Sequence, residues 1–326
     1  MSGQQPGSNI KCSLRTLVYH RVAPRVAGTD DLAPALVSAT PDRFARHLRH
    51  LTHTYVPVDA DEVLAAIQSG HRLPRGAVLV TFDDGYRDFA EIAWPLLKQY
   101  RVPCVLFVCT GYASDPTQVF WWDALWQMLS RTQRGGLVLA PFGRLPLGSS
   151  ADRMRTYRVV SERLKSIGVL ARQRMWSGLV EQLGVQPGLT AGPAVLSWPE
   201  LRCLADDGLC VAPHGRCHEL LDQVDDTTLT REVQGAREDV VQQLGKCSPF
   251  FAYPNGNFDR RAIRALQAAH YAAGFTTIGG IDTIPSDQPL LLRRDLAGVS
   301  LWRLALKLSG PVAQWRAGRR PIPTCV

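Results

Sequence analysis

Residues 77–85 read Ala-Val-Leu-Val-Thr-Phe-Asp-Asp-Gly, an apolar run that ends in two adjacent carboxylates. The run is typical of a buried parallel strand, and the final glycine lets the chain turn sharply where the strand ends. Neighbouring carboxylates repel each other unless a cation or a proton separates their roles. One of them can bind a metal while the other accepts a proton from water. A solvated Asp-Gly turn is the alternative that this motif leaves open by itself.

A second motif follows the short apolar run at 208–212 and reads Pro213-His214-Gly215-Arg216-Cys217-His218. Two histidines four residues apart can face the same way on a helical turn, as metal ligands often do. Two imidazoles and one carboxylate leave a coordination position open for water, which is the pattern of a catalytic metal site. The histidine pair is weak support alone and much stronger beside an acid pair on another strand end.

Together with Phe251-Ala252-Tyr253-Pro254-Asn255-Gly256, these motifs resemble the successive motifs of the polysaccharide deacetylases, the NodB-homology enzymes of carbohydrate esterase family 4. The resemblance extends from about Leu17 to Leu308. It implies a distorted (β/α) barrel, an α/β fold with fewer strands than the full eight. It also implies a metal-dependent hydrolase that removes acetyl groups from sugars.

Carried over by position, the resemblance makes Asp83 the general base and Asp84, His214 and His218 the metal ligands. Asp83 would take a proton from water as the water attacks the acetyl carbonyl, so that acetate and a free amino sugar result. Zinc fits this ligand set best, and cobalt, nickel, manganese or ferrous iron could also fill it.

Two further segments complete the site that the resemblance implies. Substrate and oxyanion contacts are expected at Tyr253, Pro254 and Asn255, where the backbone N–H of Asn255 would help to hold the negative charge. The early strand at 17–22 contains Tyr19-His20, and His20 is the candidate general acid that protonates the leaving amine. A histidine that only caps a strand end is the alternative.

The chain departs from the family pattern at several positions. Ala252 stands where the family usually has an arginine that orients the base, and Arg293 or Arg294 could supply that guanidinium from another strand. We name Arg294 as the candidate; a basic pair on the surface is the alternative. Gly215 and Cys217 replace the usual hydroxyl residues, and a bystander thiol is favoured over an additional ligand at Cys217.

Composition is compatible with one large catalytic domain. The chain has 326 residues, 45% of them hydrophobic, and a formal net charge of +8. Such a chain can bury a core and is not globally disordered. The positive charge suits an anionic surface or a pyrophosphate-linked sugar, although genomic base composition explains it equally. No nucleic-acid-binding motif is present, so the expected partner is a carbohydrate and not a nucleic acid.

The expected organisation is a flexible N-terminus (1–13), a catalytic barrel (14–310) and a basic C-terminal tail (311–326). The alternation of strands and helices that a barrel requires is interrupted at about 115–197, where Gly/Pro-rich turns link helical segments. This predicts an insertion on the active-site face. Three tryptophans of the insertion could form a sugar-stacking platform, although packing into the body is favoured: Trp121, Trp122 and Trp126.

Neither a secretory signal nor an apolar stretch of membrane-spanning length is seen, so we expect a cytoplasmic protein with reduced thiols. The apolar stripe at 301–308 precedes a basic tail, and such a segment can contact a membrane surface weakly. A last helix that closes the barrel is the simpler alternative.

Three functions remain open. The first is a deacetylase of GlcNAc-containing polysaccharide or oligosaccharide, a hydrolase of C–N bonds other than peptide bonds. The second is a deacylase of an intracellular lipid-linked sugar or small glycoside. The third is a sugar-binding protein without turnover, and the retention of Asp83 argues against it.

Overall fold

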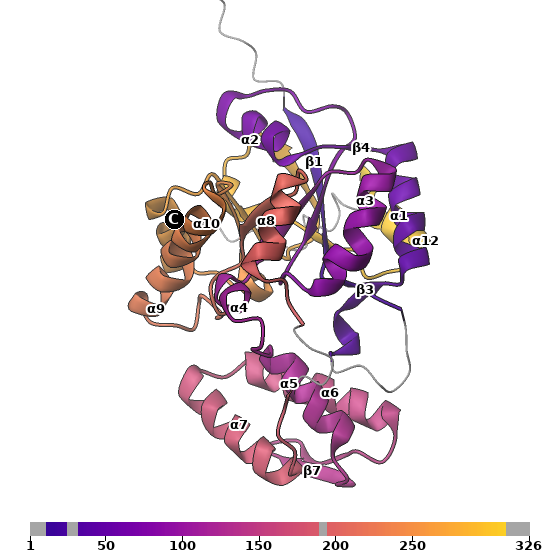
Figure 1. Cartoon of the computed structure of the whole chain (residues 1–326), viewed down its shortest axis with the longest axis vertical. Coiled ribbons are helices and arrows are strands. Elements are labelled where there is room, and N and C mark those ends of the chain that lie inside the picture. The colour runs from indigo at the N-terminus through magenta and orange to yellow at the C-terminus, as the bar shows by residue number, and fades with distance from the viewer. Residues whose placement is uncertain (1–10, 25–31, 189–193, 311–326) are drawn as a thin grey trace, which may run out of the picture.

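The computed structural model describes residues 11–24, 32–188 and 194–310 (Figure 1). Its centre is a parallel sheet in which β5 (Ala77–Phe82) lies between β1 (Cys12–Tyr19) and β6 (Cys104–Val108), with β9 (Cys210–Pro213) beyond β6. Every residue of β5 is buried. Because successive side chains of a strand point to opposite faces, both faces of β5 must be covered, which explains its continuous apolar run.

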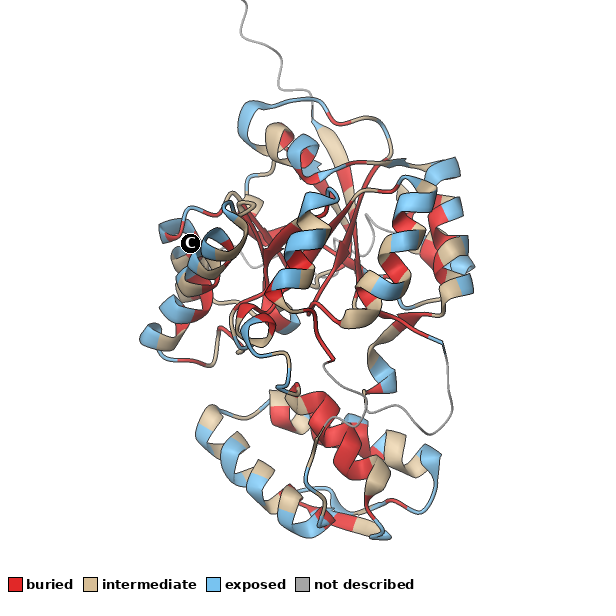
Figure 2. Cartoon of the chain, in the orientation of Figure 1, coloured by how far each residue is buried: buried red, intermediate tan, exposed pale blue. Residues whose placement is uncertain are grey.

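The two faces of β5 belong to different hydrophobic clusters. Val78 and Val80 pack in a cluster with residues of the surrounding helices, whereas Leu79 packs with Phe107 and Phe275 in the interior of the barrel. Figure 2 shows the buried strands enclosed by helices whose outer surfaces are exposed.

The sheet closes into a distorted barrel through its C-terminal strands. β10 (Phe250–Ala252) pairs in parallel with β11 (Ala273–Phe275), and an isolated bridge joins Phe275 to Leu292. β13 (Asp295–Leu296) then pairs in parallel with β1, and the imidazole of His214, just after β9, contacts the backbone of β10. The predicted distorted (β/α) barrel is therefore confirmed.

Helices lie between the strands, and polar side chains cap the starts of several of them. Thr40 and Asp59 accept hydrogen bonds from backbone N–H groups in the first turns of α1 and α2, and Ser197 begins α8 with a capping box. The helices around the barrel are α1 (Pro41–Thr54), α2 (Ala60–Ser69), α3 (Trp94–Tyr100), α4 (Thr110–Ser114), α8 (Trp198–Asp206), α9 (Asp226–Thr230), α10 (Ala236–Leu244), α11 (Arg260–Ala268) and α12 (Leu301–Leu308). The minor elements are β2 (Arg21–Val22), β3 (Val37–Ala39), β4 (Val56–Pro57), β12 (Ile281–Ile284), η1 (Pro34–Leu36), η4 (Pro254–Gly256) and η5 (Pro289–Leu291).

Two helical segments contain π-helical turns. The turn η2 (Phe89–Ala93) leads directly into α3, since Pro95 has no N–H to continue the α-helical ladder. The turn η3 (Arg231–Gly235) separates α9 from α10.

The insertion forms a lobe of its own beneath the barrel in the view of Figure 1. It contains helical segments, as expected, and also a β-hairpin that was not predicted from the sequence. Its elements are α5 (Trp121–Arg131), β7 (Gly136–Leu139), β8 (Gly143–Pro146), α6 (Ser150–Lys165) and α7 (Val169–Leu183). The return segment at 194–196 hydrogen-bonds to 85–87, with Arg87 N donating to Ala194 O and Leu196 N to Gly85 O, both at 2.9 Å.

The predicted flexible N-terminus and basic tail fall almost wholly outside the described residues. No helix within the described ranges is both long and apolar enough to span a bilayer. The cysteines for which the structure gives a state are free thiols.

Candidate active site

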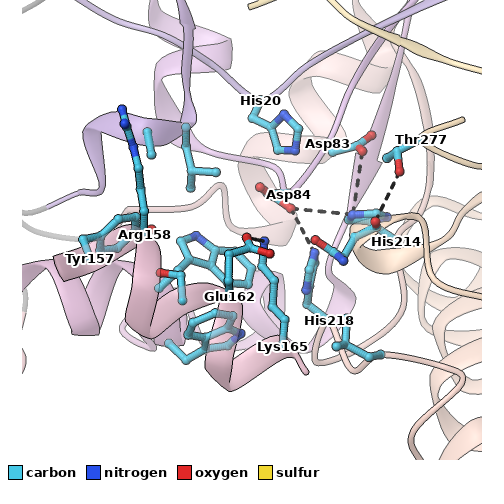
Figure 3. Close-up of a pocket in the computed structure, with 17 residues that line it drawn as sticks. His20, Asp83, Asp84, Tyr157, Arg158, Glu162, Lys165, His214, His218 and Thr277 are labelled. Atoms are coloured by element: carbon cyan, nitrogen blue, oxygen red, sulfur yellow. Dashed lines mark hydrogen bonds and ion pairs between the residues drawn. The ribbon is translucent and has the colours of Figure 1, made fainter. Parts of the chain in front are cut away.

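The C-terminal ends of the barrel strands meet around one pocket of about 260 Å³ (Figure 3). His20 follows β1, Asp83 and Asp84 follow β5, and His214 follows β9. Parallel strands bring such positions to the same edge of a barrel, where active sites of this architecture lie. The structure therefore brings these four side chains, all selected from the sequence, to one pocket.

Three side chains converge in a way that suits a metal ion. The Nε2 atoms of His214 and His218 lie 3.7 and 3.6 Å from Oδ1 of Asp84. Two ligands that each lie about 2.1 Å from one ion are about 3.5 Å apart in tetrahedral geometry. Oδ1 of Asp84 is buried without a hydrogen-bond partner, so a cation would satisfy it.

The charge states of these groups also fit. Burial lowers the pKa of both His214 and His218, so the rings are neutral, as metal ligation requires. Burial and then the charge of Asp83 raise the pKa of Asp84 well above its usual value. Nδ1 of His214 lies 2.8 Å from the carbonyl oxygen of Ala252, an interaction that fixes the ring with Nε2 facing Asp84.

The two histidines do not lie on a helical turn, and that expectation was wrong. Residues 214–218 form an irregular loop in which Gly215 has φ +76° and His218 has φ +56°. Positive φ values reverse the chain tightly, so two histidines four residues apart still point at the same carboxylate.

Glu232 holds this loop in place, and sequence reasoning missed it. Its buried carboxylate accepts hydrogen bonds from the backbone N of Arg216 at 3.0 Å and of Cys217 at 3.0 and 3.1 Å. A Cβ atom at Gly215 would lie 2.7 Å from Oε2 of Glu232. The carboxylate therefore fills the space that a side chain at 215, such as the usual hydroxyl residue, would need. Cys217 is exposed and is not among the converging ligands.

Asp83 is bound to Arg294. Nη1 and Nη2 donate to Oδ1 and Oδ2 at 2.6 and 2.8 Å, and both side chains are buried. Burial alone would raise the pKa of Asp83, but the charge of Arg294 outweighs it and lowers the pKa to about 2. Arg293 instead donates to the carbonyl of Gly279, so the structure brings only Arg294 of this pair to the carboxylate.

His20 lies at the rim of the same pocket, and its ring faces the acidic pair (Figure 3). Burial is the main cause that lowers the pKa of His20 to about 4, against the charge of Asp83, which raises it. The ring is therefore neutral at pH 7.

The segment at 251–256 contributes one residue to the pocket. Asn255, with φ +56°, lines the cavity. Tyr253 is fully buried in the core, where its hydroxyl donates to the carbonyl of Leu290 at 3.0 Å, and it does not line the pocket. Pro254, which stands between them in the sequence, is buried.

The insertion supplies the opposite wall. Trp121 and Trp122 line the pocket, and the ring of Trp122 lies 4.6 Å from that of His218. Trp126 is buried in the core of the insertion, as the favoured alternative expected. Helix α6 adds polar side chains that sequence reasoning did not select, although their spacing of about one helical turn is a signal: Arg158, Ser161, Glu162 and Lys165.

A buried polar network fastens this wall to the acid motif. The hydroxyl of Tyr86 donates to Oδ2 of Asp123 at 2.6 Å and accepts from Nε1 of Trp122 at 2.7 Å. Burial raises the pKa of Asp123 to about 6. Because Tyr86 follows Gly85 directly, the insertion and the catalytic loop are positioned together.

Comparison with known proteins points to one family. A sequence profile described as polysaccharide deacetylase matches residues 70–140 and 162–274, more than half of the chain. The chain is 32% identical over 94 residues to the poly-beta-1,6-N-acetyl-D-glucosamine N-deacetylase of Escherichia coli K12. This similarity spans 26% of the chain and only 14% of that relative's length.

Solved structures show the same fold. The deacetylase PplD of Streptococcus pyogenes, determined in complex with acetate, superposes with a TM-score of 0.60 at 19% identity over 92% of this chain and 100% of its own. IcaB from Ammonifex degensii superposes with a TM-score of 0.56 at 19% identity over 94% of this chain and 97% of its own.

Proposed function

The chain belongs to the polysaccharide deacetylase family, and we propose that it is a metal-dependent hydrolase that removes N-acetyl groups from a GlcNAc-containing polysaccharide or oligosaccharide. The observation that carries this proposal is the convergence of Asp84, His214 and His218 beside the Asp83–Arg294 pair in one pocket. The similarity to a poly-beta-1,6-N-acetyl-D-glucosamine N-deacetylase favours this class of substrate.

In the proposed reaction Asp83 is the general base. Its lowered pKa keeps the carboxylate ionised, and Arg294 fixes its orientation toward the pocket. The carboxylate takes the proton of the attacking water. A divalent metal on the three ligands would polarise the acetyl carbonyl and increase the acidity of water. Zinc suits two imidazoles and one carboxylate, and cobalt, nickel, manganese and ferrous iron are the alternatives.

The remaining roles concern the leaving group and the oxyanion. The backbone N–H of Asn255 is the proposed donor to the negative charge that develops on the acetyl oxygen. His20 is the proposed general acid for the departing sugar nitrogen. Its lowered pKa makes the imidazolium a strong acid once it forms, so His20 must take up its proton during the reaction.

A deacylase of a lipid-linked sugar or small glycoside is the second candidate. The insertion covers one side of a pocket of about 260 Å³, which suits a compact substrate. A sugar-binding protein without turnover is disfavoured because Asp83 keeps both its carboxylate and a buried cationic partner.

We also propose a weak contact with an anionic membrane surface through α12. Leu304 and Leu308 are buried against the barrel, whereas Trp302 is 63% and Leu306 48% exposed. Co-sedimentation with phosphatidylglycerol vesicles, and none with neutral vesicles, would support this contact. The cytoplasmic location remains a prediction from the sequence.

The enzymatic proposal is tested by metal content and acetate release. Protein purified without chelators should hold about one metal ion per chain and release acetate from β-1,6- or β-1,4-linked GlcNAc oligomers in the presence of Zn²⁺ or Co²⁺. Bound metal without acetate from any oligomer would favour the small-substrate candidate. Protein that binds no divalent metal would contradict the assigned ligand set.

A further inference from the structure

Helix α6 forms the wall of the pocket that faces the catalytic residues. Figure 3 shows Arg158, Glu162 and Lys165 on the side opposite Asp83. Arg158, Glu162 and Lys165 recur at intervals of four and three residues, so one face of the helix presents them all. The wall therefore carries two cations and one anion.

The position of Lys165 is fixed relative to the histidine loop. Nε2 of Gln223 donates to the carbonyl oxygen of Lys165 at 2.8 Å, and Oε1 of Gln223 accepts from Nη2 of Arg172 at 2.6 Å. Gln223 lies five residues after His218, so these bonds join the end of α6 to the segment that follows the metal ligands. The Lys165 stem consequently enters the pocket from an anchored helix end.

The protein balances the positive charge of this wall only in part. Nζ of Lys165 lies 3.7 Å from Oε1 of Glu162, which is 77% exposed and therefore largely solvated. Arg158 forms no ion pair or hydrogen bond with any described residue. On the catalytic side Asp83 is already neutralised by Arg294, and Asp84 would be neutralised by a metal.

Lys165 is also close enough to act on the catalytic groups. Burial chiefly lowers the pKa of His20, and the charge of Lys165 adds to this effect. Lys165 also lines the same pocket as His20, Asp83 and Asp84. The ammonium group thus lies within electrostatic range of the atoms that would handle the acetyl group.

A neutral acetamido sugar offers no charge to the two cations that line the pocket, whereas a phosphate or carboxylate offers charge-assisted hydrogen bonds to both. We propose that Lys165 and Arg158 form an anion subsite, and that the substrate is an acetamido sugar with an acidic group near the acetylated nitrogen. This inference rests on the proposed deacetylase function and specifies its substrate class.

The test compares three substrates with the metal-loaded protein: methyl N-acetylglucosaminide (neutral), N-acetylglucosamine 1-phosphate and N-acetylmuramic acid (a carboxylate). We expect kcat/KM for at least one acidic sugar to exceed that for the neutral sugar by about tenfold. Lys165→Met should lower this ratio about tenfold, and Arg158→Gln should lower it in the same direction. Which acidic sugar responds distinguishes phosphate from carboxylate recognition.

Arg155→Gln is the matched control, because Arg155 lies on the same helix, is 70% exposed and does not line the pocket. It should leave the ratio unchanged. A wild-type preference for the neutral sugar, or an equal loss on all three sugars in Lys165→Met, would overturn the subsite. If no sugar releases acetate, the proposed reaction is wrong. The subsite can then still be tested by calorimetry, from the ratio of the affinity for each acidic sugar to that for the neutral sugar in the same variants.

Discussion

Arg294 and Asp83 are joined by two parallel hydrogen bonds across 211 positions of the chain. The guanidinium reaches Asp83 from the segment that leads into β13. A bidentate pair fixes both the charge and the direction of a carboxylate. We propose that Arg294 orients the base in place of the arginine that the family pattern has at position 252, so the proposed base has its partner outside its own motif.

Replacing Arg294 by methionine should move the acidic limb of the pH–rate profile upward. Asp83 is active when ionised, and its pKa is about 2 because Arg294 outweighs burial. Without the guanidinium, burial raises the pKa, so the carboxylate becomes protonated and activity is lost at a higher pH. Removing one partner of a buried pair should also cost about 3–5 kcal/mol of stability. Arg294→Lys, which keeps the charge, should shift the limb less; an unchanged limb in both variants would contradict the role of Arg294.

Asp83→Asn should distinguish the proposed role of Asp83 as general base from a role as metal ligand. We expect kcat to fall by about 10²–10⁴ while the metal content stays near that of the wild type, since Asp83 is not among the converging ligands. Asp84→Asn is the complementary variant and should lose the metal itself. Full turnover by metal-replete Asp83→Asn would refute the assignment.

Glu232→Gln should weaken metal binding without touching a ligand. The carboxylate accepts from two backbone N–H groups of the histidine loop, and an amide places a donor where one of its acceptors was. We expect metal affinity, measured by chelator competition, to fall about 10–100-fold, as for other supporting residues of metal sites. Glu238→Gln is the control because Glu238 is exposed on the following helix. Equal affinities in the two variants would show that Glu232 has no part in holding the loop.

Metal binding should stabilise the protein more at pH 8 than at pH 5. The pKa of the Asp84 carboxyl is higher in the metal-free fold than in the unfolded chain. As the pH rises, the unfolded chain therefore loses the carboxyl proton first, and the free energy of unfolding of the metal-free protein falls. At low pH the retained proton competes with the metal. At free metal of 100 times Kd the metal should add about 2.7 kcal/mol. Thermal unfolding with and without Zn²⁺ measures the difference, and Asp84→Asn should show no metal-dependent shift.

The sequence was most informative where local chemistry decides the structure. The apolar run of β5 and the caps of α1 and α8 depend on neighbouring residues, and the structure has them where the sequence predicts them. Because the strands are parallel, residues that follow their C-terminal ends lie at the same edge of the barrel.

Other features depend on contacts between distant segments. Glu232 belongs to a helix that carries no recognisable motif, and Arg294 was one of two adjacent arginines that the sequence could not rank by geometry. The loop at 214–218 departs from a helical turn because Gly215 and His218 adopt positive φ. Both strands of the hairpin β7–β8 have only four residues. In β7 the exposed residue, Val138, is apolar like the buried Leu137 and Leu139, and β8 is largely exposed, so neither shows the apolar–polar alternation that indicates a strand.

The point at which the insertion rejoins the barrel lies beside the acidic motif. Its return segment at 194–196 is the backbone partner of residues 85–87, which directly follow the two acidic side chains. A graft that exchanged the whole insertion for the loop of a relative would exchange this partner as well. A chimera that is meant to transfer substrate preference alone must therefore keep the native 194–196 and join the foreign loop before it.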